Sequence, residues 1–432
     1  MPEQPTIEIR PARGPINGSV RLPGSKSYTN RALAIAALAD GRTTISDALF
    51  SDDTTYMASA LRALGIAVDE DAASRRFVVD GRGGQIPAAE AHLYLGNSGT
   101  STRFLCAIAA LGHGRYRVDG NERMRQRPIG PLVESLQALG VRVEHTGKAG
   151  FPPVDVWADG CRGGKVRMDG SLSSQYFTAL LLAAPYMRDG LDLEVDGVLV
   201  SQPYLDITID IMRAFGVAVT RAGYQRFQVS PGQGYRARDY AIEPDASNAT
   251  YFLGAAALTG GSVRIEGLGY RSAQGDVHFL DTLEALGCQA VRGEDYLEVH
   301  GPSILRGADL NLADMNDTAQ TVAALAPFCD GPVTLRGLEH TRHQETDRVA
   351  AVTTELRKLG ARVDERLDGW TIWPSNLHAA DIATYDDHRM AMAFSLIGLR
   401  VPGVRIENPD CVAKTFPDFF ERFEALTRRL GT

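Results

Sequence analysis

Arginine and lysine side chains are concentrated in a few short segments of this 432-residue chain, although its net charge is −8. The segments are GSKS at 24–27, RMRQR at 123–127 and RHQETDR at 342–348, with Lys414 closer to the C-terminus. The planar guanidinium fork of arginine suits carboxylate and phosphate groups, and lysine adds a point charge. The pattern therefore predicts substrates that are rich in phosphate and carboxylate.

Two acidic residues, Asp317 and Glu345, are grouped with these basic segments. A carboxylate among cations is normally ionised, and it can then orient the cations or move a proton between reacting groups. The alternative is structural, because either residue can cap a helix or form an ion pair with no part in catalysis. The same choice holds for His388, for which we favour the structural role. The residue types alone leave both interpretations open.

Composition and the motifs that the sequence lacks exclude several classes of protein. The net charge argues against nucleic acid or an anionic membrane as the main partner, and no apolar run approaches the length of a membrane span. The five cysteines are widely spaced, and no CxxC, HExxH, EF-hand loop or helix-opening GxGxxG is present. We therefore expect no metal and no cofactor. We also expect a cytoplasmic protein, because the N-terminus does not resemble a signal peptide.

An internal repeat of about 72 residues organises the chain. Amphipathic stretches that are typical of helices end in a glycine at six positions, which are 71 to 76 residues apart. Glycine is common directly after the last turn of a helix. These glycines are Gly65, Gly140, Gly216, Gly287, Gly360 and Gly431. Upstream in each repeat another helix is expected, and the predicted starts are Ser27, Ser98, Ser174, Ser247, Asp317 and Asp387.

Each repeat is predicted as strand–helix–strand–helix–hairpin, and the sixth repeat lacks its hairpin. Residues 6–22 have the pattern of a hairpin, so we expect them to complete the sixth repeat and to place both termini in one domain. The predicted fold is α/β, with two domains of three βαβαββ-type repeats about a pseudo-threefold axis. We expect domain 1 at 1–22 plus 243–432 and domain 2 at 23–242, with hinges near 22–24 and 242–245.

Such packing would bring three helix N-termini together in each domain. A helix N-terminus offers unpaired N–H groups and about half a positive charge. Converging N-termini therefore form an anion site without a metal, at the positions where the basic segments already favour anions.

Several strings resemble the enolpyruvyl transferase family, and most of all its members that act on shikimate 3-phosphate. They span nearly the whole chain and occur in the family's order. They are LPGSKSYTNRAL at 22–33, GNSGT at 96–100, RQRPIG at 125–130, DGSLSSQ at 169–175, SQPY at 201–204, ETDR at 345–348, DDHRMAM at 386–392 and AKTFPD at 413–418.

The resemblance implies two inside-out α/β domains that close around the substrates. It implies an enzyme that transfers the enolpyruvyl group of phosphoenolpyruvate to the 5-hydroxyl of shikimate 3-phosphate and releases phosphate, by addition and elimination in the interdomain cleft. This is a step of the shikimate pathway, which leads through chorismate to the aromatic amino acids, and it is the target of glyphosate. Family members use no metal and are usually monomers, so the expected partners are two small molecules, with no nucleic acid and no membrane.

The resemblance also assigns roles to residues at matching positions. Asp317 is expected to accept the hydroxyl proton and Glu345 to deliver a proton to the enol methylene, while a share for Lys26 or Lys414 stays open. The residues expected to bind shikimate 3-phosphate are Lys26, Ser27, Arg31, Ser173, Ser174, Gln175, Ser201, Asp317, His340 and Gln344. The residues expected to bind phosphoenolpyruvate are Lys26, Gly99, Arg127, Gln175, Arg348, Arg389 and Lys414.

Three positions depart from the family's common pattern. Gln344 stands where a lysine is usual, so an amide replaces a unit charge. Because charged hydrogen bonds are worth about 1.5–3 kcal/mol and neutral ones about 0.5–1.5 kcal/mol, we expect weaker binding of shikimate 3-phosphate unless His340 or His343 compensates. His340 replaces a frequent asparagine, and Phe104 replaces a frequent proline behind the GNSGT loop.

Two alternative functions are open to a chain of this fold. The enolpyruvyl transferases that act on UDP-N-acetylglucosamine typically carry a reactive cysteine in the loop that corresponds to 121–127, and this chain has none there. A non-catalytic anion-binding homologue would keep the fold without turnover. The presence of Asp317, Glu345, Arg348 and Lys414 argues against that second alternative.

Overall fold

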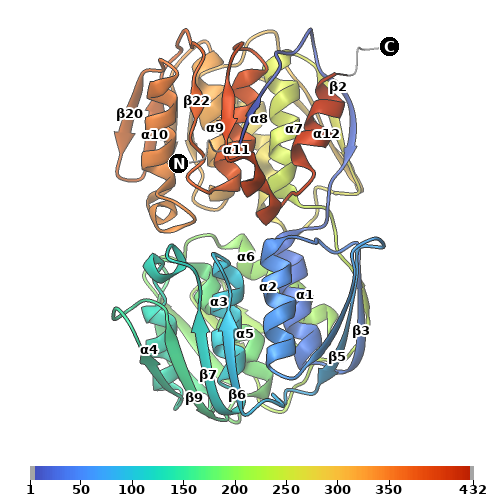
Figure 1. Ribbon diagram of the computed structural model, residues 1–432, viewed down its shortest axis with the longest axis vertical. Coiled ribbons are helices and arrows are strands. Elements are labelled where there is room, and N and C mark those ends of the chain that lie inside the picture. Colours follow the sequence, from blue (N-terminus) through green and yellow to red (C-terminus); the bar gives the residue numbers. More distant parts are fainter. Residues whose placement is uncertain (1–4, 429–432) are drawn as a thin grey trace. The chain divides into compact units, whose positions relative to one another are not determined.

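The computed structural model describes residues 5–428, which fall into two compact units (Figure 1). Unit 1 comprises Met1–Pro23 and Pro244–Thr432, and unit 2 comprises Gly24–Glu243. The chain therefore passes from one unit to the other twice. Within the described residues, every helix is too short or too polar to cross a membrane.

Unit 2 contains three repeats, each with two helices and a small sheet. The first helix of a repeat is apolar on almost all sides, so it is buried in the core, whereas the second helix is amphipathic. The first helices are α1 (Lys26–Leu38), α3 (Gly99–Ala109) and α5 (Ser174–Ala183), and the second helices are α2 (Asp52–Ala63), α4 (Gly130–Ala138) and α6 (Pro203–Ala214). Short 3-10 turns are η1 (Met124–Gln126) and η2 (Ala184–Tyr186).

The three sheets of unit 2 share one topology. A leading strand pairs in parallel with the strand that follows the first helix, and that strand pairs antiparallel with the second strand of a hairpin. In spatial order the sheets are β14 (Asp239–Ala241), β3 (Asp40–Ser46), β5 (Arg76–Arg82), β4 (Ala67–Asp71); then β6 (Glu90–Tyr94), β7 (His113–Asp119), β9 (Val154–Asp159), β8 (Arg142–His145); and β10 (Gly164–Asp169), β11 (Leu191–Asp196), β13 (Arg226–Val229), β12 (Thr220–Ala222).

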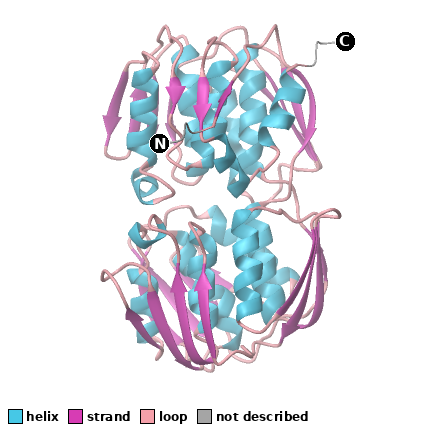
Figure 2. Ribbon diagram, viewed as in Figure 1, coloured by secondary structure: helices cyan, strands magenta, loops and turns pink. Residues whose placement is uncertain are grey.

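Unit 1 repeats this design with its own three pairs of helices. The first helices are α7 (Ala246–Thr259), α9 (Ala319–Leu325) and α11 (His388–Gly398), and the second helices are α8 (Phe279–Ala285), α10 (Arg348–Lys358) and α12 (Phe419–Thr427). Five 3-10 turns precede or follow them: η3 (Gly275–His278), η4 (Asn316–Thr318), η5 (Ala326–Phe328), η6 (Glu339–His343) and η7 (Pro409–Lys414). In each unit the helices are central and the sheets lie around them (Figure 2).

The sheets of unit 1 show how the N-terminal strands are used. Two sheets have four strands, and the sixth repeat has three. In spatial order they are β16 (Gln289–Arg292), β17 (Tyr296–His300), β15 (Ser262–Glu266), β2 (Asn17–Arg21); then β18 (Ala308–Asn311), β19 (Val333–Arg336), β21 (Gly369–Ile372), β20 (Val363–Arg366); and β1 (Thr6–Glu8), β23 (Arg405–Glu407), β22 (Asp381–Ile382).

The prediction of a hairpin over 6–22 is wrong. β1 does pair with β23 of the sixth repeat, antiparallel, but β2 pairs in parallel with β15 of the fourth repeat. The reason is that the fourth repeat has no leading strand from the segment directly before its first helix. The strand that precedes α7 in the chain is β14, and β14 pairs with β3 in unit 2, so the fourth repeat takes β2 as its leading strand instead.

The predicted helix boundaries are confirmed within the described residues. The second helices of the first five repeats are followed by Gly65, Gly140, Gly216, Gly287 and Gly360, whose φ angles lie between 85° and 96°. Only glycine adopts this left-handed region without strain, which explains the recurring residue. The sixth such residue, Gly431, lies outside the described residues. Five of the predicted starts of first helices are within one residue of an observed start. The other, Asp317, lies in the 3-10 turn η4, which begins at Asn316 and leads into α9 at Ala319.

Candidate functional site

Arg348 is the centre of a buried ion-pair cluster in unit 1. It is the first residue of α10, and its side chain is 2% exposed. Its Nε donates to Asp387 Oδ2 at 2.8 Å, its Nη1 to Asp317 Oδ1 at 2.8 Å, and its Nη2 to Glu345 Oε2 at 3.0 Å. Burial opposes the guanidinium charge, but the three carboxylates outweigh burial and raise the pKa of Arg348. The arginine is therefore held as a cation, with donors that face three acids.

Asp317 connects Arg348 to a second buried arginine, Arg389. Arg389 Nη2 donates to Asp317 Oδ2 at 2.6 Å, and its Nη1 donates to Tyr251 Oη at 3.3 Å. Asp317 lies in η4, Arg389 in the first turn of α11, and Tyr251 on α7. The contacts therefore join all three repeats of unit 1, and guanidinium groups contact both carboxylate oxygens of Asp317.

Gln344 and His340 lie next to this cluster. Gln344 Nε2 donates to Asn316 Oδ1 at 3.0 Å, and Gln344 Oε1 accepts a short hydrogen bond from Arg348 Nη1. Burial lowers the pKa of His340 to about 4, although the charge of Asp317 opposes that shift. His340 is therefore neutral at pH 7, and it does not supply the charge that a lysine at position 344 would carry.

Lys414 is the last residue of η7 and is 8% exposed. η7 packs against α11, the helix that carries Arg389. The structure thus brings six of the seven predicted site residues of unit 1 into one network and places Lys414 on a neighbouring turn. The six are Asp317, His340, Gln344, Glu345, Arg348 and Arg389.

The other predicted site residues belong to unit 2, where α1 carries Lys26, Ser27 and Arg31. Lys26 is the first residue of α1, and its Nζ lies 3.9 Å from Oδ2 of Asp53, a buried acid in the first turn of α2. Ser27 follows Lys26, and its carbonyl accepts a hydrogen bond from Arg31 Nη1 at 2.9 Å. The first turn of α1 is thus held from the side of α2 and from within the helix.

Arg31 is buried and connects α1 to α6. Its Nε donates to Thr208 Oγ1 at 2.8 Å and its Nη2 to Tyr204 O at 3.0 Å. Burial lowers the pKa of Arg31 to about 10. Its guanidinium carbon lies 5.3 Å from the ring centre of Phe104, so the phenylalanine at this position of α3 stacks on the arginine. Three of the five donor hydrogens of Arg31 therefore hold the protein together.

Gly99, Arg127 and Gln175 lie around the start of α3. Arg127 Nη1 donates to the backbone O of Asn97 at 3.0 Å and also lies 3.2 Å from Asn97 Oδ1. A Cβ atom on Gly99 would lie only 2.5 Å from Arg127 Nη2, so the glycine leaves space for the guanidinium. Gln175 Nε2 lies 3.5 Å from Thr100 Oγ1, which connects the start of α5 to the start of α3.

The other three predicted serines are found at helix starts of the third repeat. Ser173 is the N-cap of α5, and its Oγ accepts a hydrogen bond from the backbone N–H of Gln175 at 3.2 Å. Ser174 is the first residue of the same helix. Ser201 precedes α6 with a φ of 55°, in the left-handed region that is unusual for residues other than glycine. Such strained backbone is often found at functional sites.

Several residues that support the site are not among the predicted site residues. Asp387 caps α11 by accepting the backbone N–H of Arg389 at 2.9 Å while it also binds Arg348. Asp53 and Asn97 hold Lys26 and Arg127 in unit 2. Their signal was their place at the repeated helix starts, which the sequence shows but does not rank. Among the described residues, no three His, Cys, Asp or Glu side chains are grouped so that they could hold a metal ion.

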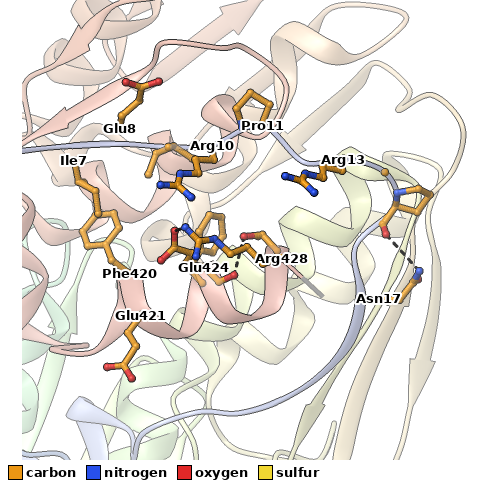
Figure 3. Close-up of a pocket in the computed structure, with 15 residues that line it drawn as sticks. Ile7, Glu8, Arg10, Pro11, Arg13, Asn17, Phe420, Glu421, Glu424 and Arg428 are labelled. Atoms are coloured by element: carbon orange, nitrogen blue, oxygen red, sulfur yellow. Dashed lines mark hydrogen bonds and ion pairs between the residues drawn. The ribbon is translucent and has the colours of Figure 1, made fainter. Parts of the chain in front are cut away.

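A cavity of about 650 Å³ lies elsewhere in unit 1, between the N-terminal segment 7–17 and α12. Arg10 and Arg13 extend over it, and Glu424 pairs with Arg428 below them (Figure 3). None of the predicted site residues lines this cavity.

Comparison with known proteins identifies the family. The family model of EPSP synthase (3-phosphoshikimate 1-carboxyvinyltransferase) matches residues 11–423. The 3-phosphoshikimate 1-carboxyvinyltransferase of Trichormus variabilis is 48% identical over 418 residues, which cover 97% of this chain and 98% of the relative. The enzyme of the same name from Serratia proteamaculans is 46% identical over 416 residues, which cover 96% and 97%.

Solved structures share the fold. EPSP synthase from Acinetobacter baumannii superposes with a TM-score of 0.80 at 24% identity and covers 98% of both chains. The enolpyruvyl transferase NikO from Streptomyces tendae gives a TM-score of 0.77 at 21% identity, again over 98% of both chains. These likenesses confirm the predicted α/β fold. Because the family model and the sequence relatives cover nearly the whole chain, this protein belongs to the EPSP synthase (3-phosphoshikimate 1-carboxyvinyltransferase) family.

Proposed function

We propose that this protein transfers the enolpyruvyl group of phosphoenolpyruvate to the 5-hydroxyl of shikimate 3-phosphate, giving 5-enolpyruvylshikimate 3-phosphate and phosphate in the shikimate pathway. The observation that carries the proposal is the cluster of Arg348 and Arg389 around Asp317, with Glu345 on the same arginine. Two buried guanidinium groups suit an anionic substrate, and two carboxylates beside them suit proton transfer.

The addition step needs two proton movements, and the two carboxylates match them. In the addition step, the 5-hydroxyl oxygen bonds to C2 of phosphoenolpyruvate while the methylene carbon C3 gains a proton. Asp317 takes the hydroxyl proton, and Glu345, which must first take up a proton, supplies the proton to C3. In the elimination step, Glu345 takes a proton back from C3 of the tetrahedral ketal phosphate, the C2–C3 double bond forms again, and the bond between C2 and the phosphate oxygen breaks, so that phosphate leaves with the electron pair.

The carboxylate of phosphoenolpyruvate binds Arg348 and Arg389 in this proposal. Their N–H groups contact Asp317, Glu345 and Asp387 in the structure, so the substrate competes with these acids for the same donors. A substrate carboxylate that displaces one contact of Asp317 leaves an oxygen available for the hydroxyl proton. Binding of one substrate thereby prepares the base for the other.

Shikimate 3-phosphate and the phosphate of phosphoenolpyruvate are assigned to unit 2. Helix α5 begins with adjacent hydroxyl groups at Ser173 and Ser174, and helix N-termini favour phosphate. Lys26 and Arg127 add cationic charge near the starts of α1 and α3. Gly99 and Gln175 add further predicted contacts. Ser27, Arg31 and Ser201 complete the part of the shikimate set that lies in unit 2, while Asp317, His340 and Gln344 belong to unit 1.

The proposal requires the nine predicted residues of unit 2 and the seven of unit 1 to act on one pair of substrates, in a cleft that closes between the units. Closure would exclude water, which strengthens electrostatic stabilisation of the developing charge. We further propose that the protein acts as a cytoplasmic monomer. Its five cysteines are all free, as is usual in a reducing compartment.

A coupled assay of phosphate release tests the proposed function. Purified protein is incubated with phosphoenolpyruvate and shikimate 3-phosphate, and the organic product is identified by mass spectrometry. We expect stoichiometric phosphate and 5-enolpyruvylshikimate 3-phosphate, with neither formed when one substrate is omitted. Turnover with UDP-N-acetylglucosamine instead, or binding of both ligands without turnover, would show that the proposed function is wrong.

A further inference from the structure

Asp276 is a buried acid of unit 1 that the proposed reaction does not use. It lies in η3 and is 6% exposed, and its Oδ2 accepts a short hydrogen bond from the hydroxyl of Ser247. Ser247 is 8% exposed and lies in the first turn of α7. A carboxyl group so deeply buried, with a neutral hydroxyl as its direct partner, needs a physical explanation.

The position of Asp276 is fixed by its neighbours. Gln274, two residues earlier, accepts the backbone N–H of Ala246 at 3.0 Å and donates to the backbone O of Pro244 at 2.8 Å. Together with the contact between Asp276 and Ser247, these bonds attach the segment 274–276 to the start of α7 at three points. The carboxyl of Asp276 is therefore held in place beside the helix N-terminus.

The charges that act on Asp276 come from three repeated helix starts. Burial and then the charge of Asp317 raise the pKa of Asp276 to about 7, with a smaller contribution in the same direction from Asp245. The hydrogen bond from Ser247 and the charge of Arg389 oppose this shift. Asp276 is thus electrostatically linked to the same Asp317 and Arg389 that form the anion-binding cluster.

The cluster already holds more carboxylates than arginines, so another ionised acid beside it would be unfavourable. Arg348 and Arg389 contact three carboxylates, those of Asp317, Glu345 and Asp387. An ionised Asp276 would add a fourth negative charge close to a site that must accept an anion. A protonated Asp276 adds none, and its hydrogen bond to Ser247 still holds the start of α7.

We propose that Asp276 is a positioning residue of the anion site, which acts through Asp317 and Ser247 and which must carry a proton for phosphoenolpyruvate to bind tightly. This inference rests on the proposed function, because it names the ligand of that site. Loss of the proton places a negative charge beside Asp317 and Arg389, so binding of the substrate is linked to uptake of one proton by Asp276.

Steady-state kinetics between about pH 6 and about pH 8.5 test the proposal. KM for phosphoenolpyruvate and kcat are measured at saturating shikimate 3-phosphate for the wild type, Asp276→Asn and Ser247→Ala. Asp276→Asn is neutral and keeps a partner for Ser247. We expect the KM of the wild type, divided by the KM of Asp276→Asn, to rise about three- to tenfold from the acidic to the alkaline end of the range. The change should appear in KM and not in kcat.

The control variant and the substrate's own titration sharpen this comparison. Ser247→Ala keeps the carboxyl of Asp276 but removes a hydrogen bond that lowers its pKa, so KM should still rise with pH, with the rise moved to higher pH. Titration of the substrate phosphate affects all three proteins equally and cancels in the ratio. A ratio that stays constant over the whole range would mean that Asp276 only anchors α7, and the proposal would be overturned.

Infrared difference spectroscopy separates this inference from the proposed function, because it needs no turnover. The carboxylic acid C=O band is followed by pH titration in the wild type and in Asp276→Asn. We expect a band that disappears with a midpoint near pH 7 in the wild type and that is absent from the variant. If the two proteins give the same spectra above about pH 5, Asp276 is ionised at neutral pH and the inference is wrong, whatever the enzyme's substrates are.

Discussion

Asp317 is the residue on which the proposed chemistry depends most. Its two oxygens contact Arg348 and Arg389, so it combines a role in charge balance with a role as base. We predict that Asp317→Asn lowers kcat by about 100- to 10,000-fold, because general base catalysis typically contributes that much. Both substrates should still bind, since the amide keeps the shape of the side chain and removes a competing negative charge.

Rapid-quench kinetics and isothermal titration calorimetry measure these two effects on Asp317→Asn separately. The matched variant Glu345→Gln alters the other candidate carboxylate and should slow proton delivery to the methylene. If Asp317→Asn retains near-normal kcat, Asp317 is not the base.

The buried His340 leads to a prediction about the free energy of unfolding and its dependence on pH. Its pKa is about 4 in the folded protein, against 6.5 in the unfolded chain, so the unfolded state binds more protons between these values. Stability is therefore lost as pH falls from 6.5 towards 4. We predict that the free energy of unfolding of His340→Asn, taken relative to the wild type, is about 2 to 3 kcal/mol higher at pH 4 than at pH 7.

Urea unfolding of the wild type and His340→Asn at the two pH values measures this difference. His378→Asn is the control, because it makes the same substitution at an exposed position. Equal changes in the free energy of unfolding at both pH values for His340→Asn would contradict the assignment of a neutral, buried His340.

Gln344 shows how a contact changes an expectation based on charge alone. The sequence predicts that Gln344→Lys tightens binding of shikimate 3-phosphate. The structure adds that Gln344 Oε1 accepts a hydrogen bond from Arg348 Nη1, which a lysine cannot accept. We therefore predict opposite effects, a lower KM for shikimate 3-phosphate and a higher KM for phosphoenolpyruvate, each by about three- to tenfold.

Gln344→Met separates the effect of the added charge from the effect of the lost hydrogen bond, because methionine has neither the amide acceptor nor a charge. It should raise KM for phosphoenolpyruvate without lowering KM for shikimate 3-phosphate. If Gln344→Lys changes KM for shikimate 3-phosphate and KM for phosphoenolpyruvate in the same direction, the charge at position 344 and the hydrogen bond to Arg348 do not act on different substrates.

At the scale of elements, the start of α3 is sensitive to a single methyl group. A Cβ on Gly99 would lie 2.5 Å from Arg127 Nη2 and from Arg103 Nη1. Both contacts are with the ends of flexible side chains, so we expect Gly99→Ala to fold with little loss of stability. The displaced Arg127 would weaken its contact with Asn97, and KM for phosphoenolpyruvate should rise about tenfold.

Glyphosate inhibition provides a second measurement for Gly99→Ala, and its inhibition constant should rise at least as much as KM. The control is Gly331→Ala, where the nearest atom would be Gly307 Cα at 3.5 Å, an ordinary contact distance. An unchanged KM in Gly99→Ala would show that Arg127 does not need the space that the glycine leaves.

The elements themselves were largely predictable, because local rules determine them. The glycines after the second helices follow from the left-handed φ at helix ends, and they marked five observed boundaries. The partners of β1 and β2 were not predictable from the N-terminal pattern. Two short alternating segments separated by a turn suggest a hairpin, whereas β2 pairs with β15, about 240 residues away in the sequence.

The cluster around Arg348 was predictable in its residue types and less so in its contacts. The sequence indicates which arginines and acids gather at the helix starts. It does not reveal that Arg348 is shared by Asp317, Glu345 and Asp387, or that Gln344 contacts Arg348. The contacts of Arg348 with Asp317 and Asp387 join different repeats that meet only in the folded unit, so no local pattern encodes them. Gln344 and Glu345 lie within one helical turn of Arg348, but their spacing alone does not show that they share it.

At the scale of the whole molecule, the chain divides its predicted site residues between two units that it joins twice. Seven lie in unit 1 and nine in unit 2. Each unit alone offers a cluster of cations and helix starts. The central claim is that both clusters act on the same phosphoenolpyruvate molecule.

The most direct test is kcat/KM for phosphoenolpyruvate in two single variants, Arg127→Met in unit 2 and Arg389→Met in unit 1, with folding checked by near-ultraviolet circular dichroism. Arg221→Met and Arg405→Met are the controls, since they remove arginines from surface ion pairs, which contribute little. We predict that each of the first two variants lowers kcat/KM by at least about 100-fold and that neither control does. A folded Arg127→Met or Arg389→Met with near-normal kcat/KM would contradict a single site shared by the two units.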